Sequence, residues 1–199
     1  MADFALEAEL LKKNYSRICG VDEVGRGCLF GPVVAGAVIL DPECLNHEYD
    51  DSKKLAPRQR LRLARDIYEK ALAYSIGWCW NDEIDRSNIL AATKQSMRLA
   101  VQRLQVKPDY VLIDAIAHDF LPVNGRAVVK GDEKSLSIAA ASIIAKVFRD
   151  HLLENLADFF PEYGLAQNKG YPTKKHKNML LLHGVTIFHR MSFKLKNGC

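Results

Sequence analysis

The chain has 199 residues, of which 48% are apolar and 26% are charged. This composition predicts one folded domain, or one domain with a small appendage, and excludes a disordered chain. The longest apolar stretch, residues 29–40, is interrupted by glycine and proline and is too short to span a membrane. The five cysteines form no CxxC pair and no zinc pattern, so we expect reduced thiols in a cytoplasmic protein.

The net charge of +4 is unevenly distributed along the chain. Residues 163–199 contain seven Lys and Arg and no Asp or Glu, so the rest of the chain is net negative. A basic segment joined to an acidic body suggests a polyanionic partner, such as nucleic acid, held beside a carboxylate site. A solvated basic helix would have the same composition, so this feature alone leaves both interpretations open.

Apolar periodicity predicts alternating strands and helices. Short apolar or alternating runs predict strands at residues 17–22, 30–41, 74–80, 110–114 and 126–132. Apolar residues at helical spacing predict helices at residues 57–72, 87–105, 135–150 and 173–183. Residues 151–159 either extend the third of these helices or form a short separate one. The order predicts an α/β fold with a mixed sheet and a small helical C-terminal part.

Local signals refine three of these elements. Glycines within residues 25–31 favour a hairpin between the first two strands. The Ala and Ser residues of the helix at 135–150 would let it lie close against the sheet. Thr173 is suited to the N-cap of the last helix, and Gly184 to its end.

Three of the predicted strands end in an acid, at Asp22, Asp114 and Asp132, and Glu23 follows the first of them. Ligands of α/β sheets gather at strand ends, so neighbouring strands would bring four carboxylates together. A divalent cation would relieve their mutual repulsion, and oxygen-only ligands suit Mg²⁺ or Mn²⁺ rather than zinc. For each acid alone, a turn or N-cap role is the more common interpretation, and it is the set of four that favours a functional site.

Carboxylates beside a basic segment point to phosphoryl transfer on a polyanion, for which two metal ions are a common device. No P-loop, dinucleotide-binding or nucleophile-elbow motif supports another nucleotide chemistry. Three further acids are expected in turns or polar loops outside this site: Asp41, Asp51 and Asp119. The histidines at 118, 176, 183 and 189 form no pair at metal-ligand spacing, and we assign them no chemistry.

Six sequence blocks cover nearly the whole chain. They are GVDEVGRGCLFGPVVAGAVIL (20–40), DSKKL (51–55), YVLID (110–114), KGDEKSLSIAAASIIAKVFRD (130–150), YGLAQNKGYPTKKH (163–176) and HRMSF (189–193). In this combination and order they closely resemble the type 2 ribonuclease H family, ribonuclease HII. Type 3 enzymes of the same superfamily carry a GKG-like variant, whereas this chain has Gly25-Arg26-Gly27.

The resemblance implies a ribonuclease-H-like mixed five-stranded sheet flanked by helices. Residues 1–160 would form the catalytic domain, and residues 161–199 a basic helical segment completing the substrate groove. The same four acids would bind two Mg²⁺ or Mn²⁺ ions and catalyse the reaction. The implied activity is hydrolysis of RNA in RNA/DNA hybrids and cleavage 5′ of single ribonucleotides in duplex DNA, leaving 3′-hydroxyl and 5′-phosphate ends. We expect a monomer without membrane association.

Substrate recognition is expected from two short segments. Gly25 and Gly27 would leave the backbone open to a ribose, and Arg26 would hold a phosphate. The resemblance implies that Tyr171 stacks on the deoxyribose 3′ of the ribonucleotide. Phosphate-contact candidates are Lys53, Lys54, Lys169, Lys174, Lys175 and Lys177. The plain alternatives are hairpin glycines, a tyrosine packed over its turn and solvated lysines.

Three positions depart from the family pattern without affecting an acid. Cys28 stands where proline is common, Ala115 where glycine is usual, and Met191 where a basic residue is frequent. Two other functions remain open: another two-metal nuclease of this architecture, such as a resolvase or a less selective hybrid-cutting enzyme, and a nucleic-acid-binding module without chemistry. The four acids argue against the binding module. Only an enzyme that recognises a ribose needs both the glycine triplet and Tyr171.

Overall fold

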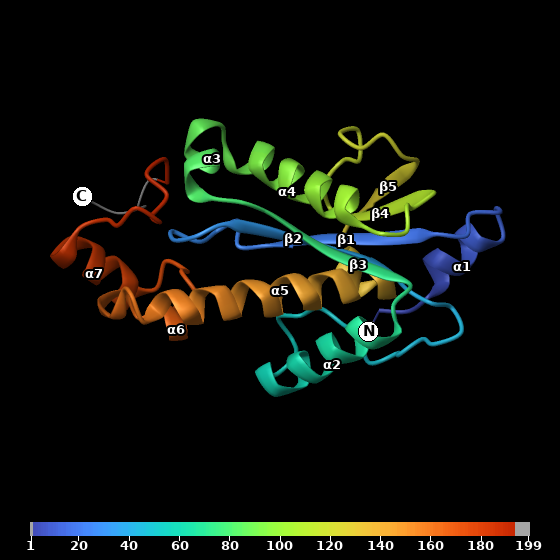
Figure 1. The fold of residues 1–199 in the computed structure, drawn as a ribbon, viewed down its shortest axis with the longest axis horizontal. Coiled ribbons are helices and arrows are strands. Elements are labelled where there is room, and N and C mark those ends of the chain that lie inside the picture. The colour runs from blue at the N-terminus through green and yellow to red at the C-terminus, as the bar shows by residue number, and fades with distance from the viewer. Residues whose placement is uncertain (1, 194–199) are drawn as a thin grey trace.

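The computed structural model describes residues 2–193 and shows a five-stranded mixed sheet with helices on both faces (Figure 1). The strands are β1 (Ile18–Val24), β2 (Val33–Ile39), β3 (Ala73–Cys79), β4 (Tyr110–Asp114) and β5 (Gly125–Val128). Their order is β3-β2-β1-β4-β5, in which β3, β2 and β1 pair antiparallel and β4 and β5 run parallel to β1. The predicted α/β fold with a mixed sheet is confirmed.

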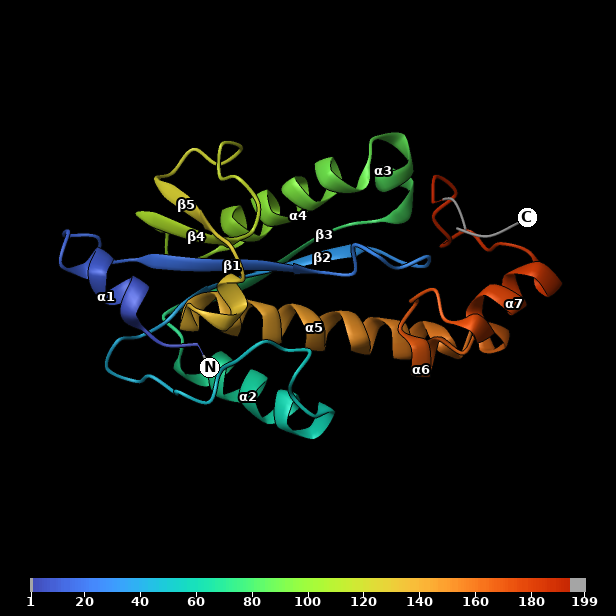
Figure 2. The ribbon, with the colours of Figure 1, turned by 180° about the vertical axis from the view of Figure 1, so that it is seen from behind.

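Helices cover both faces of the sheet. They are α1 (Ala5–Leu11), α2 (Pro57–Lys70), α3 (Asn81–Arg86), α4 (Ile89–Arg103), α5 (Leu136–Ala157), α6 (Leu165–Asn168) and α7 (Lys174–His183), with 3₁₀ turns η1 (Gly131–Glu133) and η2 (Pro161–Tyr163). Figures 1 and 2 show α4 on one face and α5, backed by α2, on the other. α5 continues to Ala157, so most of the segment at 151–159 extends that helix.

Small residues bring α5 into direct contact with the sheet, as its Ala and Ser content predicts. A Cβ added to Gly20 on β1 would lie 2.0 Å from the carbonyl carbon of Ser137, and one on Gly36 of β2 would lie 2.3 Å from the carbonyl oxygen of Ala141. Any larger residue at these two positions would push the helix away. The sheet therefore holds α5 in a fixed position relative to β1.

The hydrophobic core has a part on each face of the sheet. On the α5 side it includes Leu63, Ile67, Ala140 and Ile144. On the α4 side it includes Met97, Ala100, Val111 and Ile113. The two parts pack against opposite faces of β1, β2 and β4, so the residues on these strands are held rigidly.

Sequence periodicity misses α1, which is only 7 residues long. Its Glu7 is buried, and the Oε1 atom accepts the backbone N–H of Ser137 at 3.0 Å and the Ser137 hydroxyl at 2.6 Å. The N-cap residue Ser135 also donates to Glu7. A negative side chain thus satisfies the N-terminus of α5, where the helix dipole favours it.

The C-terminal segment, residues 161–193, lies at the far end of α5 (Figures 1 and 2). It packs around an apolar cluster formed by Phe30, Leu153, Tyr163 and Leu165. As predicted, α7 begins after Thr173, whose side chain accepts the N–H of His176, and ends at Gly184. Two lysines of the basic segment, at 194 and 196, lie outside the described residues.

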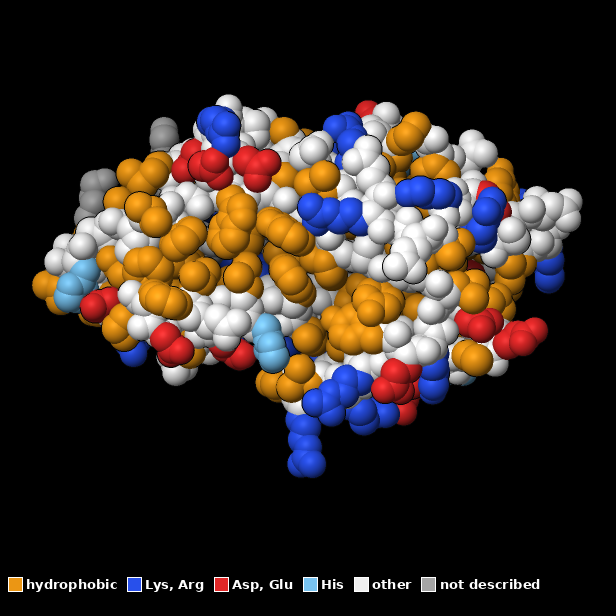
Figure 3. Space-filling view, in the orientation of Figure 1, with side chains coloured by type: hydrophobic (Ala, Val, Ile, Leu, Met, Phe, Trp, Pro, Cys, Tyr) orange, Lys and Arg blue, Asp and Glu red, His pale blue; other side chains and the backbone are white. Residues whose placement is uncertain are grey.

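One face of the molecule carries a band of hydrophobic side chains across its middle (Figure 3). β3 is an edge strand of the sheet (Figure 1), and the large residues Leu72 and Tyr74 at this edge are exposed. Within residues 2–193, no helix is long and apolar enough to cross a membrane.

Candidate active site

The central strand positions the first two acids. β1 lies between β2 and β4, and Asp22 and Glu23 are adjacent near its C-terminal end. Asp22 is only 3% exposed, and its Oδ1 accepts the backbone N–H of Glu23 at 2.7 Å. The strand itself therefore holds both carboxylates, without help from a mobile loop.

Asp114 is the last residue of the neighbouring parallel strand. β4 pairs with β1 so that Ile113 lies opposite Val21, which puts Asp114 beside Asp22 at the same end of the sheet. The Oδ1 atom of Asp114 accepts the backbone N–H of Gly131 at 2.6 Å. This hydrogen bond ties the end of β4 to the η1 turn.

The prediction that Asp132 ends a strand is wrong. β5 ends at Val128, and Asp132 lies in η1, which follows a left-handed residue, Lys130, with φ of +56°. That conformation ends the extended chain, and apolar periodicity does not reveal it. Because Gly131 is bonded to Asp114, the turn still carries Asp132 toward the acids on the strands.

Burial and like charge dominate the electrostatics of these acids. Burial, and then the neighbouring acids, raise the pKa of Asp22 well above its ordinary value. Burial also raises the pKa of Glu23, against the opposing effect of Arg26. The pKa of Asp132 is raised in the same way, by burial and then by Asp114. The acids are therefore close enough to repel one another in a poorly hydrated place, which is the situation that a cation relieves.

The residues fit a hard divalent cation in chemistry. All four side chains offer only oxygen, and Oε2 of Glu23 is buried without a hydrogen-bond partner in the described structure. No group of three or more His, Cys, Asp or Glu side chains among residues 2–193 is arranged to hold an ion unaided. Mg²⁺ typically takes only one or two protein carboxylates and completes its shell with water and substrate phosphate, so an incomplete protein cage is compatible with it.

A pocket of about 220 Å³ is lined both by one of these acids and by residues predicted to recognise the substrate. It is lined by Glu23, Val24, Gly25, Arg26, Gly27, Ser52, Lys53, Ser142, Lys146 and Tyr171. The glycine triplet and Tyr171 come from distant parts of the chain, and they face a single space. A sugar in this pocket would contact both.

Two charged residues are not predicted as part of the site from the sequence: Lys146, which lines the pocket, and Asp51, which lies beside the pocket residue Lys53. Lys146 on α5 is 2.6 Å from Asp150 and lies over the Tyr171 ring, 5.8 Å from its centroid. Asp51, which we expected outside the site, lies 3.9 Å from Lys53, and the same ammonium is 3.8 Å from Asp132. The one sequence feature that could indicate a role for Lys146 is its i, i+4 spacing to Asp150 on a helix that contributes to the pocket.

Most of the other predicted phosphate contacts lie outside this pocket. Lys169 donates to Glu154 and to the carbonyl of Ala166, and Lys54 lies 2.9 Å from Glu133. Three lysines stand on α7, away from the pocket: Lys174, Lys175 and Lys177. Only Lys53 of the six candidates lines the pocket.

Arg26 is held by its own neighbour. Its guanidinium donates to Glu23 at 3.1 Å, and its backbone carbonyl accepts a hydrogen bond from Arg190 at 3.0 Å. A phosphate contact by Arg26 therefore requires its side chain to leave Glu23, and that role stays a prediction.

A chain of hydrogen bonds between two buried histidines fixes the turn that carries Tyr171. His176 Nδ1 lies 3.0 Å from the Tyr171 carbonyl, which can only accept, so this nitrogen carries the proton. His176 Nε2 must then accept from His189 Nε2 at 3.2 Å, and His189 Nδ1 accepts the backbone N–H of Thr186 at 2.9 Å. Only one pair of neutral tautomers satisfies all of these hydrogen bonds. The two histidines come from separate segments of the chain.

Two of the departures from the family pattern have a visible local effect. Ala115 adopts φ of +50°, a left-handed conformation that favours glycine, so the methyl group strains the backbone. Cys28 is buried, and its backbone N–H lies 3.4 Å from the Gly25 carbonyl, a hydrogen bond that proline would lack. Neither residue displaces an acid.

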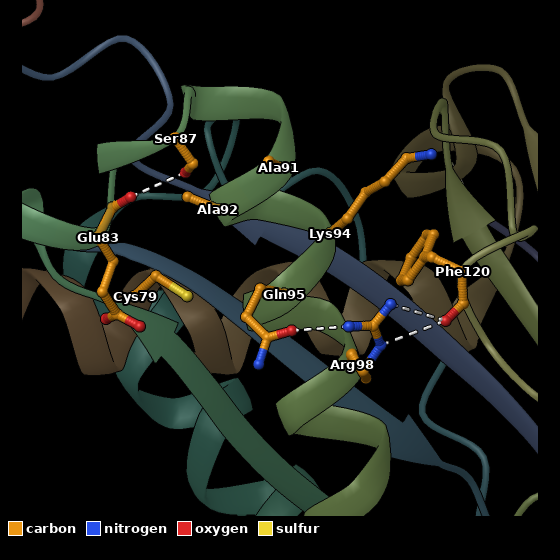
Figure 4. A pocket seen from close by; sticks show the side chains of 9 residues that line it. All are labelled: Cys79, Glu83, Ser87, Ala91, Ala92, Lys94, Gln95, Arg98 and Phe120. Carbon is orange, nitrogen blue, oxygen red and sulfur yellow. Dashed lines mark hydrogen bonds between the residues drawn. The ribbon is translucent and has the colours of Figure 1, made fainter. Parts of the chain in front are cut away.

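Another hollow, of about 430 Å³, lies between α3, α4 and the segment at Phe120 (Figure 4). Its polar groups bind one another: Arg98 donates to Gln95 and to the Phe120 carbonyl, and Ser87 donates to the carbonyl of Glu83. None of the four predicted catalytic acids lines this hollow, and it shares no lining residue with the pocket at the glycine triplet. We assign it no part in the site.

Comparisons with known proteins agree with this geometry. The family model described as Ribonuclease HII matches residues 19–196. A ribonuclease HII of Vibrio vulnificus is 53% identical over 92% of this chain and 88% of its own length, and one of a Ruegeria species is 49% identical over 96% and 84%.

Solved structures show the same fold. Ribonuclease H2 of Pyrococcus horikoshii superposes with a TM-score of 0.75 at 27% identity, covering 90% of this chain and 94% of that one. The ribonuclease HII in a PCNA complex from Archaeoglobus fulgidus gives 0.77 at 26% identity, with 92% and 98% covered. On the match to the family model and to relatives at about half identity over most of their length, this chain belongs to the ribonuclease HII family of RNA-hydrolysing endonucleases.

Proposed function

We propose that this enzyme cuts the RNA strand of RNA/DNA hybrids and also cuts on the 5′ side of a single ribonucleotide within duplex DNA, leaving 3′-hydroxyl and 5′-phosphate ends. One observation carries the proposal: the glycine triplet, Tyr171 and Glu23 line the same pocket. A ribose differs from a deoxyribose by one hydroxyl that both donates and accepts. Backbone groups left open by Gly27, where an added Cβ would meet nothing within 4 Å, can contact such a hydroxyl closely.

The four acids have a common role in this proposal. Asp22, Glu23, Asp114 and Asp132 would hold two Mg²⁺ or Mn²⁺ ions, which when bound would supply activation of a water molecule and stabilisation of the leaving oxygen. The strand geometry keeps Asp22 and Asp114 in fixed register, and the N–H of Gly131 orients the Asp114 carboxylate. Among residues 2–193, no hydrogen-bond donor competes for Oε2 of Glu23.

Tyr171 and the lysines orient the nucleic acid. The Tyr171 ring stacks on the sugar that follows the ribonucleotide, while Lys53 neutralises a phosphate near the acids. Residues 161–193 form one side of the groove, with Lys174, Lys175 and Lys177 of α7 contacting the duplex farther from the cut. In this division of labour, the C-terminal segment contributes affinity and the pocket contributes selectivity.

The test uses three duplexes with Mg²⁺ present: DNA holding one ribonucleotide, a continuous RNA/DNA hybrid, and all-DNA. We expect cleavage of the first two, with the cut in the first placed 5′ of the ribonucleotide, and no cleavage of the third. Cleavage of the hybrid alone would reduce the proposal to a less selective hybrid-cutting enzyme. Binding without a product from any duplex would indicate a binding module and overturn it.

A further inference from the structure

A buried arginine joins the two segments that face the proposed ribose pocket. Arg149 on α5 has no exposed surface, and it is among the largest side chains that are fully buried. Its three hydrogen bonds all end on backbone carbonyl oxygens. Burying a guanidinium is costly unless its donors are all well placed, so this residue needs a positional explanation.

The three hydrogen bonds of Arg149 span two distant parts of the chain. Nε donates to the Pro32 carbonyl at 3.0 Å and Nη2 to the Phe30 carbonyl at 3.0 Å, both in the loop that follows the glycine triplet. Nη1 donates to the Lys169 carbonyl at 2.8 Å, two residues before Tyr171. One rigid, planar group therefore sets the spacing between the loop and the tyrosine turn.

The glycines beside Arg149 make room for it. Gly25 has φ of +93°, and an added Cβ would lie 2.3 Å from Nε of Arg149. Gly170 has φ of +80°, and its added Cβ would lie 2.8 Å from the Phe30 carbonyl oxygen and 3.4 Å from Nη2 of Arg149. The absence of a side chain at Gly25 thus serves the guanidinium beneath the loop, whereas Gly27 has open space around it.

We propose that Arg149 is a positioning residue that fixes the distance between the glycine triplet and Tyr171, and so determines the preference for a single ribonucleotide followed by deoxyribose. The inference rests on the proposed function. A continuous hybrid offers a ribose at every step and tolerates a shifted tyrosine. A lone ribonucleotide allows only one placement of its ribose and of the deoxyribose that follows. A small change in the spacing between the glycine triplet and Tyr171 therefore moves the ribonucleotide out of the reactive position.

The test is the ratio of kcat/KM for the single-ribonucleotide duplex to kcat/KM for the continuous hybrid. Arg149→Lys keeps the positive charge but cannot reach three carbonyls at once. We expect the ratio to fall by up to about a hundredfold, because a displacement near 1 Å can cost that much in rate. Arg98→Lys is the matched control, since Arg98 also donates to a backbone carbonyl but lies in the hollow of Figure 4, and its ratio should not change.

A second variant guards against a failure of folding. Gly170→Ala presses on the Phe30 carbonyl, which accepts a hydrogen bond from Arg149, and should lower the same ratio even if Arg149→Lys does not fold. Equal losses on both substrates in the folded variants would show that Arg149 only stabilises the fold, and would overturn the inference. A wild-type enzyme that cuts the hybrid but never the single ribonucleotide would instead overturn the proposed function.

Discussion

The acids and the substrate readers are positioned in different ways. The sheet and its turns hold the acids: Asp22 is bonded to the next peptide N–H and Asp114 to the N–H of Gly131. The glycine triplet and Tyr171, which we call the reading region, adjoin a loop and a turn whose backbone carbonyls are bound by buried polar side chains, chiefly Arg149 and the histidine pair. Under the proposed function, the chemistry would depend on the backbone of the core, whereas selectivity would depend on a few side chains that can be changed without disrupting the sheet.

The largest effect should come from the acids. Asp22→Asn or Asp114→Asn should lower cleavage by on the order of a thousandfold or more, while folding and duplex binding persist. In the metal-free protein, Asp22→Asn should also raise Tm, because it removes a repelling, buried charge. Cleavage assays and thermal melts with and without Mg²⁺ measure both effects. Asp119→Asn, in a loop and paired with Lys94, is the control and should behave as wild type.

Substantial cleavage in either acid variant, or full wild-type cleavage in excess EDTA, would remove the acids from the chemistry. The contrast between a core that carries the chemistry and a reading region that carries the selectivity would then be wrong.

Tyr171 tests the reading region directly. Tyr171→Ala should lower the rate on a single embedded ribonucleotide by roughly a hundredfold, because a misplacement of the sugar by about 1 Å can cost that much. Tyr171→Phe should keep most of the rate, since stacking needs the ring and not the hydroxyl. Tyr74→Ala, at the exposed edge strand, serves as the control. If phenylalanine is as damaging as alanine, the hydroxyl carries the function; if alanine retains the wild-type rate, Tyr171 only packs over its turn.

The histidine pair should make the reading region sensitive to acid. Burial, and then the charge of His176, lower the pKa of His189 to about 4, and burial lowers the pKa of His176. As the pH falls, the histidines therefore take up protons in the unfolded chain before they do so in the folded protein. Their contribution to the free energy of unfolding is fully present above the ordinary pKa near 6.5 and is lost as pH falls toward 4. The loss should be on the order of 2 to 3 kcal/mol. Urea unfolding across this range measures it.

A variant separates this contribution from general acid unfolding. His189→Gln should flatten the dependence of unfolding free energy on pH between 6.5 and 4, whereas His47→Gln, at an exposed position, should not. An unchanged slope in the His189 variant would mean that other groups cause the acid sensitivity.

The lysines of α7 should affect affinity more than selectivity. Replacing Lys174, Lys175 and Lys177 together by alanine should raise KM and reduce the salt slope of binding by about 0.9 for each phosphate that is no longer neutralised. The cut position should not change. The control replaces three exposed lysines elsewhere: Lys12, Lys13 and Lys107. An unchanged salt slope would mean that the α7 lysines only solvate their helix.

The smallest effect concerns the backbone next to an acid. Ala115→Gly should raise the unfolding free energy by about 1 kcal/mol or slightly less, because relief of the left-handed strain outweighs the added freedom of the unfolded chain. Chemical denaturation measures it. A destabilised glycine variant would show that the strain at this position is already relieved by its surroundings.

The sequence predicts the acids of the strands better than their surroundings. Apolar runs ending in Asp22 and Asp114 are visible without a structure, and the resemblance adds the activity. The η1 turn is hidden because it depends on one left-handed residue, Lys130. α1 and α3 are too short for a periodic signal.

Long-range contacts account for the remaining gap. The sequence does not reveal that Arg149 is buried, since an arginine on a helix is usually solvated. Nor does it reveal that Lys146 approaches Tyr171, because that contact depends on how α5 meets the tyrosine turn. Spacing along the chain likewise misses the histidine pair, which forms only when α7 and residues 186–189 fold against each other.

The fixed tautomers of the two histidines give the protein an internal spectroscopic label. His176 should carry its proton on Nδ1 and His189 on Nε2, and both protons are shielded from solvent exchange by burial. Nitrogen-15 spectra distinguish these two forms, and the His176 signal is sensitive to the hydrogen bond with the carbonyl of Tyr171. A change in that signal on adding a duplex would follow the tyrosine turn as it engages a sugar, without a probe attached to the pocket.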